Sequence, residues 1–417
     1  MDSNRSGRRQ FLQSAALAGL AAGTGRPASG QSEADAKDTH IHGEPSRFVT
    51  SGPGLAVNKR IDHMTYYTPL QDSAGILTPA SLHFMQTHDS RLPDIDPKQH
   101  RLTIHGMVDR PLSFTMEDLK RLPSVSRIHF LECHGNGSPM RHTDHEKKGG
   151  LPIQYVHGMT SCSEWTGVLL SVLLNEAGLQ KGASWLVSEG GDDGKFSHTL
   201  PLAKAMDDVI VAYAQNGEPV RPEQGYPLRL VVPGFEGPSN VKWLRHIKVV
   251  DQPYMTWNES MNHSIPRPDL GGKSRWYHFE MAPKSVITRP SSGHKLPSKG
   301  FYEITGLAWS GGGTVRKVEI STDGGKSWKH AKLQTPVLRM AHTRFTFDWS
   351  WDGEETVIQS RCTDDRGEVQ PSLAELNKNW GITDAAHSQV GSRAIHINAI
   401  QPWKVARDGS VYDAMFS

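Results

Sequence analysis

The chain has few cysteines and no large excess of charge of either sign. Its 417 residues include three cysteines, Cys133, Cys162 and Cys362, and its formal net charge is +2. Three cysteines leave at least one thiol outside any disulfide, and their spacing matches neither a zinc knuckle nor a Cys-x-x-Cys-His haem site. Basic and acidic residues are interspersed, so the basic stripe that nucleic-acid binding requires is absent from the sequence. We therefore expect no haem in this chain, no nucleic-acid partner, and one cysteine with a role other than cross-linking.

Long hydrophobic runs are also missing. The apolar run Ser14–Gly23 is too short and too weakly hydrophobic to span or anchor in a bilayer. It follows Arg8 and Arg9, and this order is typical of a twin-arginine export signal. The sequence therefore predicts a signal peptide at residues 1–30, a polar arm at 31–60, a periplasmic location and no membrane anchor. A chance basic pair before an unstructured tail is the alternative.

The length predicts two folded domains, because it exceeds what one ordinary core accommodates. Between residues 61 and 255, short β-type runs such as Arg101–His105 alternate with helical stretches such as Val168–Ala177. This part is expected to be a mixed α/β domain. Residues 256–284 are rich in proline and glycine and are interpreted as a connection.

Residues 285–410 predict a second domain that is all-β. Short alternating runs are separated by turn residues at the spacing of a β-sandwich, and Asp323–Gly325 is a hairpin signal. The expected strands include Phe301–Leu307, Val315–Ser321, Arg344–Trp349, Thr356–Arg361 and Ile395–Ile400. The predicted fold class of the whole chain is α+β.

Cys133 follows an apolar β-type run and precedes a glycine-rich turn. The run is Arg127–Glu132, and the turn reads His134-Gly-Asn-Gly. A sulfur at such a strand end can be approached closely by a ligand, which suits a metal thiolate or a nucleophile. A free cysteine is more often a buried apolar filler, and we interpret Cys162 and Cys362 in that way. For Cys133 the local residues leave both roles open.

A second stretch combines glycine-rich turns with two cations. Residues 221–234 and 240–244 frame a strand-like run and carry Arg229 and Lys242. Such an arrangement suits a phosphate-bearing ligand. A pair of solvated loops with surface charges explains the same residues equally well.

Five motifs follow one another along the chain, at residues 131–136, 215–234, 241–244, 308–312 and 321–328. Together they resemble those of sulfite oxidase-type molybdenum enzymes. Within that family they are most similar to the molybdenum subunit of bacterial sulfane dehydrogenases, the SoxC type. The similarity runs in unbroken order from about Thr65 to Ser410.

This resemblance implies a mixed α/β domain that binds a pyranopterin dithiolene molybdenum cofactor, followed by an immunoglobulin-like domain used in dimer contacts. The family's metal-binding cysteine falls on Cys133, and a soft thiolate is a suitable molybdenum ligand. The family's cofactor contacts fall on His88, Cys133, Asp192, Gln224, Arg229, Asn240, Val241 and Lys242.

The implied activity is oxidation of a small sulfur compound, either sulfite or protein-bound sulfane sulfur. The chain has no haem motif, so the implied electron acceptor is a separate c-type cytochrome. A homodimer or a heterotetramer is the expected assembly. The alternatives are a related molybdenum-dependent sulfoxide reductase and an exported family member that has lost catalysis.

Two substrate-pocket residues of the family are replaced in this chain. Gln86 stands in place of an Arg, and His263 in place of a Tyr; His134 also replaces a Ser beside Cys133. We expect Gln86 and His263 at the catalytic centre and a weaker affinity for anions, because Gln lacks the permanent charge of Arg. An imidazole with an ordinary pKa of about 6.5 would make activity on an anion fall as pH rises through neutrality. The alternative is that His263 faces solvent.

Overall fold

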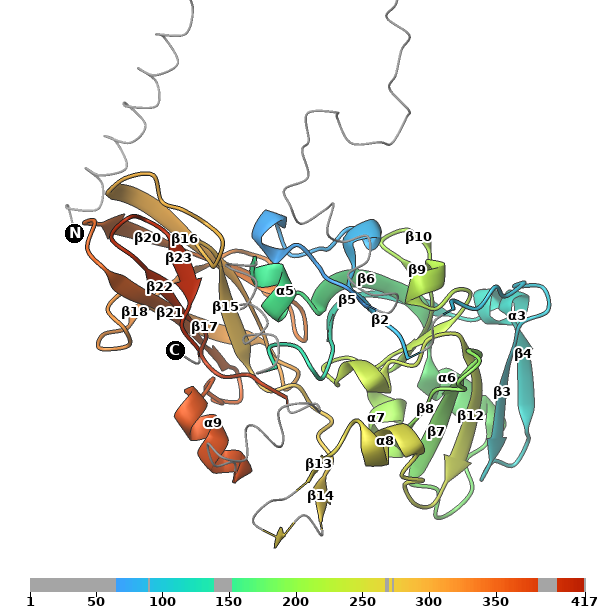
Figure 1. Cartoon of the computed structure of the whole chain (residues 1–417). Coiled ribbons are helices and arrows are strands. Elements are labelled where there is room, and N and C mark those ends of the chain that lie inside the picture. The colour runs from blue at the N-terminus through green and yellow to red at the C-terminus, as the bar shows by residue number, and fades with distance from the viewer. Residues whose placement is uncertain are drawn as a thin grey trace, which may run out of the picture.

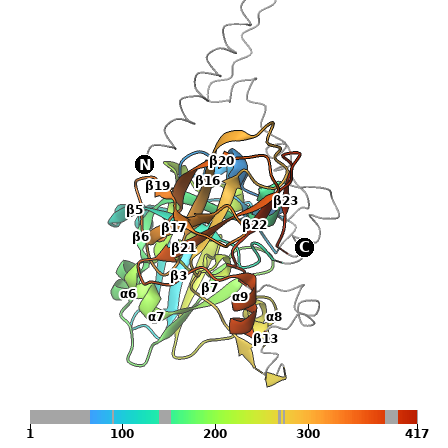
Figure 2. The same cartoon turned by 90° about the vertical axis from the view of Figure 1, so that its left-hand side faces the viewer.

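A computed structural model describes residues 65–88, 91–138, 152–266, 270–271, 274–381 and 396–415. The predicted signal peptide and arm lie outside these residues. The described part has the predicted α+β class, with a mixed domain at one end of the molecule and a β-sandwich at the other (Figure 1). Figure 2 shows the molecule from the side of the β-sandwich. In the described residues, no helix is both long enough and apolar enough to cross a membrane.

Two five-stranded sheets form the first domain. One has the order β10-β9-β6-β5, with β11 pairing with β9; the other has the order β4-β3-β12-β7-β8, where only β3 and β12 are parallel. The strands of the first sheet are β5 (Ser124–Glu132), β6 (Thr160–Leu169), β9 (Ile210–Gln215), β10 (Glu218–Pro219) and β11 (Arg229–Val231). Those of the second are β3 (Arg101–Gly106), β4 (Leu112–Thr115), β7 (Trp185–Gly190), β8 (Ser197–Pro201) and β12 (Leu244–Val250).

Short helices cover these sheets and close the loops. Met116–Arg121 forms α3, whose capping box joins Thr115 and Asp118 as an N-terminal Thr with an acidic residue three positions later favours. The predicted helix Val168–Ala177 is α6, which begins at Leu170 because the first two residues continue β6. The other helices of this domain are α5 (Ile153–His157), α7 (Leu202–Asp207), α8 (Trp257–Met261), η1 (Leu70–Asp72), η2 (Ala80–Leu82), η3 (Pro222–Gln224) and η4 (Gly237–Ser239).

Two pairs of very short strands lie outside the main sheets. β1 (Thr65–Tyr66) pairs with β2 (Met85–Gln86), and β13 (Ile265–Pro266) pairs with β14 (Arg275–Trp276). The first pair matters for the site described below, because it fixes the backbone of Gln86.

Two antiparallel sheets pack together in the second domain, in the orders β15-β16-β20-β19 and β18-β17-β21-β22-β23. Four of the five expected strands and the Asp323–Gly325 hairpin are present. One helix, α9 (Leu373–Trp380), follows β21. The strands are β15 (Lys284–Arg289), β16 (Gly300–Trp309), β17 (Val315–Ser321), β18 (Lys329–His330), β19 (Lys332–Leu333), β20 (Thr343–Trp351), β21 (Thr356–Asp364), β22 (Pro402–Val405) and β23 (Val411–Asp413).

The expected strand at Ile395–Ile400 is wrong for the residues described, 396–400. Their polar groups bond outside a sheet ladder: the Ile400 N–H donates to the Pro371 carbonyl, and the Gln370 side chain donates to the Ala399 carbonyl. Ile397 and Ala399 of this segment are buried in a small cluster with α9. The strand in this region is β22, which begins at Pro402.

The two domains share buried surface beside β5. Phe130 and Ile153 of the first domain belong to the same hydrophobic cluster as Trp309 and Phe345 of the second. The Phe130 N–H donates to the Met340 carbonyl, which also crosses the interface. The end of β5, where Cys133 begins the next loop, therefore lies against the second domain.

Candidate functional site

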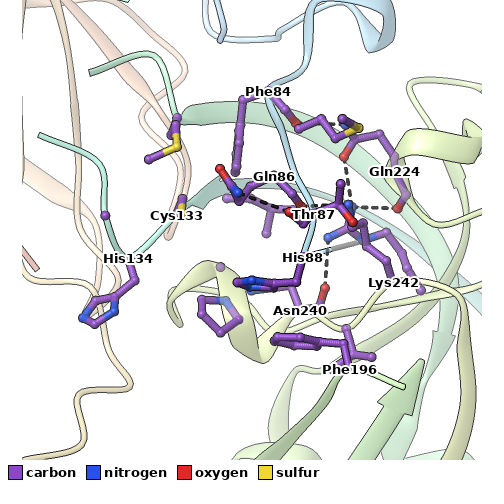
Figure 3. A pocket seen from close by; sticks show the side chains of 18 of the residues that line it. Phe84, Gln86, Thr87, His88, Cys133, His134, Phe196, Gln224, Asn240 and Lys242 are labelled. Carbon is purple, nitrogen blue, oxygen red and sulfur yellow. Dashed lines mark hydrogen bonds between the residues drawn. The ribbon is translucent and has the colours of Figure 1, made fainter. Parts of the chain in front are cut away.

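A cavity of about 370 Å³ opens in the first domain, and it contains every site residue that the sequence predicted. In the view of Figure 3, Cys133 and His134 lie on one side, Gln224 and Lys242 on the other, and Gln86, Thr87 and His88 between them. The predicted residues that line it are Gln86, His88, Cys133, Asp192, Gln224, Arg229, Asn240, Val241, Lys242 and His263. Residues from 86 to 263 thus converge on one space, while their individual roles stay predictions.

Cys133 is presented to the cavity by the end of β5. Its N–H donates to the Met159 carbonyl, and its carbonyl accepts from the Asn136 N–H at 3.0 Å, so a tight turn follows the strand. Gly237 packs directly on this turn, since a Cβ there would lie 3.1 Å from the Cα of Cys133. Half-buried Cys133 is thus held in a fixed backbone frame with its side chain on the cavity wall.

The other two cysteines are placed in cores, as their interpretation as fillers predicted. Both are fully buried, and burial raises the pKa of the Cys162 thiol to about 12 and that of Cys362 still further. A thiol that stays protonated is a poor nucleophile and a poor metal ligand. Cys133 is therefore the one cysteine placed to bind a ligand in the cavity.

Arg229 is a buried cation whose hydrogen bonds go to neutral groups. Its guanidinium donates to the Gln224 carbonyl at 2.9 Å, to the Gln224 side chain and to the Asn240 carbonyl. It also lies over the Trp165 ring at 4.8 Å. Burial lowers its pKa to about 9, so it remains charged near neutral pH. An isolated buried charge is costly, and an anion in the cavity would offset that cost.

Lys242 is the second cation. Its ammonium donates to the carbonyls of Gln86 and Glu223 at 2.9 and 3.1 Å, and burial followed by the charge of Arg229 lowers its pKa to about 7. Among the described residues, no carboxylate lies within ion-pair distance of Lys242 or Arg229. Two neighbouring cations with carbonyl partners form a site for a phosphate group. The residues present therefore fit a phosphate-bearing cofactor such as a pyranopterin.

Three other predicted contacts hold this frame in place. The Gln224 amide donates to the Phe84 carbonyl, and the Asn240 side chain accepts from Val232 and donates to the Glu236 carbonyl. Asp192 accepts from the Phe196 N–H. Because the Asn240 amide is used within its own loop, Asn240 shapes the cavity chiefly through the backbone of that loop.

Gln86 reaches the cavity from β2. Its side-chain oxygen accepts from the Thr65 hydroxyl at 2.8 Å, and its amide donates to the Thr87 carbonyl at 3.3 Å. Gln86, which replaces the family's Arg, thus lines the cavity with a neutral side chain. Its side-chain oxygen already accepts a hydrogen bond from Thr65.

His263 also lines the cavity and is only 7% exposed, so the alternative that it faces solvent is wrong. Its ring lies among those of His88, His134 and His198, at centroid distances of 5.5, 6.2 and 6.0 Å. Burial first, and then these histidines, lower its pKa well below 6.5. The expected change of charge near neutrality is therefore also wrong: His263 is a neutral imidazole throughout that range.

Two further cavity histidines were not selected from the sequence. Burial lowers the pKa of both His83 and His134 to about 3. Neither ring nitrogen of His134 has a hydrogen-bond partner among the described residues, although its Nε2 lies 3.6 Å from Oε2 of Glu236. The position of His134 next to Cys133 in the sequence could have indicated a place in the site. The residues around His83 contain no such indication.

Within the described ranges, no group of three or more histidine, cysteine or acidic side chains is arranged to hold a metal ion.

Comparisons with known proteins identify the family of both domains. The family model for an oxidoreductase molybdopterin binding domain matches residues 89–258, and that for a Mo-co oxidoreductase dimerisation domain matches residues 275–390. A solved structure of the sulfane dehydrogenase SoxCD from Paracoccus pantotrophus is 36% identical, with a TM-score of 0.78. The match covers 92% of this chain and 95% of that chain.

Curated relatives point to a second activity in the same group. The NADH nitrate reductase of Ulva prolifera is 32% identical over 340 residues, which are 72% of this chain and 38% of that protein. The NADH nitrate reductase of Volvox carteri is 33% identical over 286 residues, 62% of this chain and 33% of that protein. The chain thus spans between a third and two fifths of the length of these relatives.

Proposed function

Because this chain belongs to the sulfite oxidase-type family of molybdopterin oxidoreductases, we propose that it oxidises a small sulfur compound, sulfite or protein-bound sulfane sulfur. The observation that carries the choice of sulfur is the similarity to a sulfane dehydrogenase over 95% of that chain. The nitrate reductases are matched over much smaller shares of their length. An enzyme, rather than a member without catalysis, is what the family implies.

Different residues of the cavity would bind different parts of the cofactor. Arg229 and Lys242 would hold its phosphate, and Cys133 would bind its metal as a thiolate. When bound, the cofactor supplies oxygen-atom transfer and takes up two electrons. Gly237 keeps the Cys133 turn close to η4, and the carbonyls around Arg229 keep the cation fixed before the phosphate arrives.

The substrate would lie beside Cys133, among His134, His263 and Gln86. These side chains are uncharged near neutral pH, so they can orient a substrate through hydrogen bonds without attracting it by charge. His134 and His263 have ring nitrogens without partners among the described residues. A pocket of this kind favours a sulfur group with little charge, or one delivered by a carrier, over a free dianion.

Steady-state assays on the molybdenum-loaded protein test the proposal. We expect oxidation of sulfite or of a persulfide-bearing carrier with ferricyanide as acceptor, and slower turnover of nitrate or of a sulfoxide with reduced methyl viologen as donor. The reverse ranking would favour a reductase, the activity named for the nitrate reductase relatives.

For electron transfer, we propose a c-type cytochrome in a complex with this chain, which itself forms a homodimer or a heterotetramer. Support comes from α8, which carries the exposed side chains of Trp257 (69%) and Met261 and directly precedes Asn262 and His263 of the cavity. A partner on this apolar surface would therefore lie next to residues that lead into the cavity. Trp257→Asp should slow reduction of the cytochrome but leave ferricyanide reduction unchanged, and equal losses with both acceptors would argue against docking there.

Export remains a proposal based on Arg8 and Arg9. Replacing both with Lys should retain the protein in the cytoplasm. Normal recovery of this double variant from the periplasm would remove the proposal.

A further inference from the structure

A buried ion pair joins the two domains beside Cys133. Lys284, at the start of β15, donates to Oε1 of Glu132, at the end of β5, at 2.9 Å. Both side chains have 0% exposure. The pair connects residues 152 positions apart, one in each domain.

Hydrogen bonds to the ion pair come from the Cys133 turn and from the second domain. Asn136 donates its amide to Oε1 of Glu132 at 2.9 Å, and its carbonyl accepts from the Lys284 ammonium at 3.1 Å. Trp309, at the end of β16, donates its indole N–H to Oε2 of Glu132 at 2.7 Å. Glu132 directly precedes Cys133 and Asn136 lies three residues after it, so the network encloses the turn.

The turn also packs closely on its surroundings at Gly137. This residue has φ +81°, which favours glycine, and a Cβ there would lie 2.9 Å from the His157 ring. A side chain at position 137 would therefore strain the turn and clash with His157. Gly137 thus helps to keep the turn in the conformation in which the Asn136 carbonyl accepts from the Lys284 ammonium.

Stability alone is a weak reason for this pair. Burying two charges costs about as much as their attraction returns, and apolar replacements of buried pairs are often neutral or stabilising. What a fully satisfied network provides is one fixed geometry. Here that geometry is the position of a turn whose cysteine faces the cofactor cavity.

We propose that Lys284 and Trp309 of the second domain are positioning residues for Cys133. The second domain, besides any role in dimer contacts, thereby completes the frame of the metal site. This inference rests on the proposed role of Cys133 as the metal ligand.

Thiol labelling provides a readout that does not depend on turnover. In the full-length chain purified without cofactor, a maleimide should label Cys133 alone, because Cys162 and Cys362 are fully buried. Lys284→Met should speed this labelling several-fold, and in the loaded enzyme it should lower molybdenum retention by about 10- to 100-fold, as losses of groups that orient a metal ligand do.

A second variant separates positioning from stability. Lys284→Met alone leaves the Glu132 carboxylate buried without its ion-pair partner, so the melting temperature of this variant should fall. Adding Glu132→Gln removes the unpaired charge and should restore much of the melting temperature. Labelling should stay fast and molybdenum retention low in this double variant. Wild-type labelling and retention in a stable double variant would overturn the proposal.

Lys204→Met is the matched control. It breaks another ion pair, Lys204–Asp208 at 2.7 Å, whose side chains are 11% and 7% exposed, in a part of the first domain that does not line the cavity. It should lower the melting temperature without changing Cys133 labelling. Labelling as fast as in Lys284→Met would show a general loosening of the protein and would contradict the proposal.

Cys133→Ser tests the assignment of the metal ligand separately. If the thiolate-to-metal absorption of the loaded enzyme survives this change, the assignment of Cys133 as the ligand fails, and not the positioning role of Lys284.

Discussion

The two sides of the cavity differ in how their polar groups are used. On the phosphate side, Arg229 and Lys242 donate to carbonyls that fix their positions. On the cysteine side, His134 and His263 have ring nitrogens without partners in the described part of the chain. The two sides thus suit different ligands. Cations held in fixed positions suit an anionic cofactor that stays bound, whereas neutral ring nitrogens without partners suit a substrate that binds and dissociates in each turnover.

A change at Cys133 should cause the most severe loss of activity. Cys133→Ser should abolish sulfur oxidation while the fold and the phosphate frame remain, because an alcohol is a much poorer donor to molybdenum than a thiolate. Cys162→Ala and Cys362→Ser serve as controls and should retain most activity. Kinetics and pterin content of the three purified variants provide the measurement. A comparable loss of activity in Cys162→Ala would mean that the wrong cysteine has been assigned as the metal ligand.

Loss of the fixed cation should come next. Arg229→Ala removes charge-assisted hydrogen bonds worth about 3 kcal/mol together, and cofactor affinity should fall by about a hundred-fold. Pterin fluorescence after dialysis against limiting cofactor measures this loss. Arg344→Ala is the matched control, because Arg344 is also buried against carbonyls, those of Ser73 and Gly75, but lies outside the cavity. Equal cofactor loss in both variants would show that destabilisation, and not phosphate binding, is responsible.

Restoring a cation on the cysteine side should make the two sides more alike. Gln86→Arg should lower the KM for sulfite by about tenfold, the value of one charge-assisted bond of about 1.5 kcal/mol. His263→Tyr should change affinity less, because His263 is already neutral. Neither wild type nor His263→Tyr should show a step in kcat/KM near pH 6.5 from this residue. An unchanged KM in Gln86→Arg would indicate that position 86 does not contact the substrate.

The smallest effect concerns pH on the phosphate side. The pKa of Lys242 is lowered to about 7, so in the cofactor-free protein its charge is present at pH 6 and largely lost at pH 8. Arg229 keeps its charge over this interval. Stabilisation by sulfate, an anion that does not titrate here, should therefore be larger at pH 6 than at pH 8. Thermal shifts in sulfate and in chloride of equal ionic strength measure the difference, and Lys242→Met should remove the pH dependence.

Much of the fold could be predicted from local sequence. The capping box at Thr115, the hairpin at Asp323–Gly325 and the period-2 runs of the sandwich depend on neighbouring residues, whose preferences a short window contains. The segment 396–400 shows the limit of that approach. Its residues have the pattern of a β-strand, but its backbone bonds with Gln370 and Pro371 instead of with another strand. No pattern within the segment indicates partners that lie so far away in the sequence.

For the site, the amino-acid sequence specifies which chemical groups are available: a cysteine at a strand end, two cations among glycine-rich turns, and a Gln and a His in place of an Arg and a Tyr. The charge state and the surroundings of these groups depend on the folded structure. It gathered His88, His134, His198 and His263 into one buried cluster and so kept His263 neutral, and it placed Lys284 of the second domain against Glu132. A pKa or a buried ion pair depends on desolvation and on charges a few ångströms away, and those neighbours come from residues far apart in the chain.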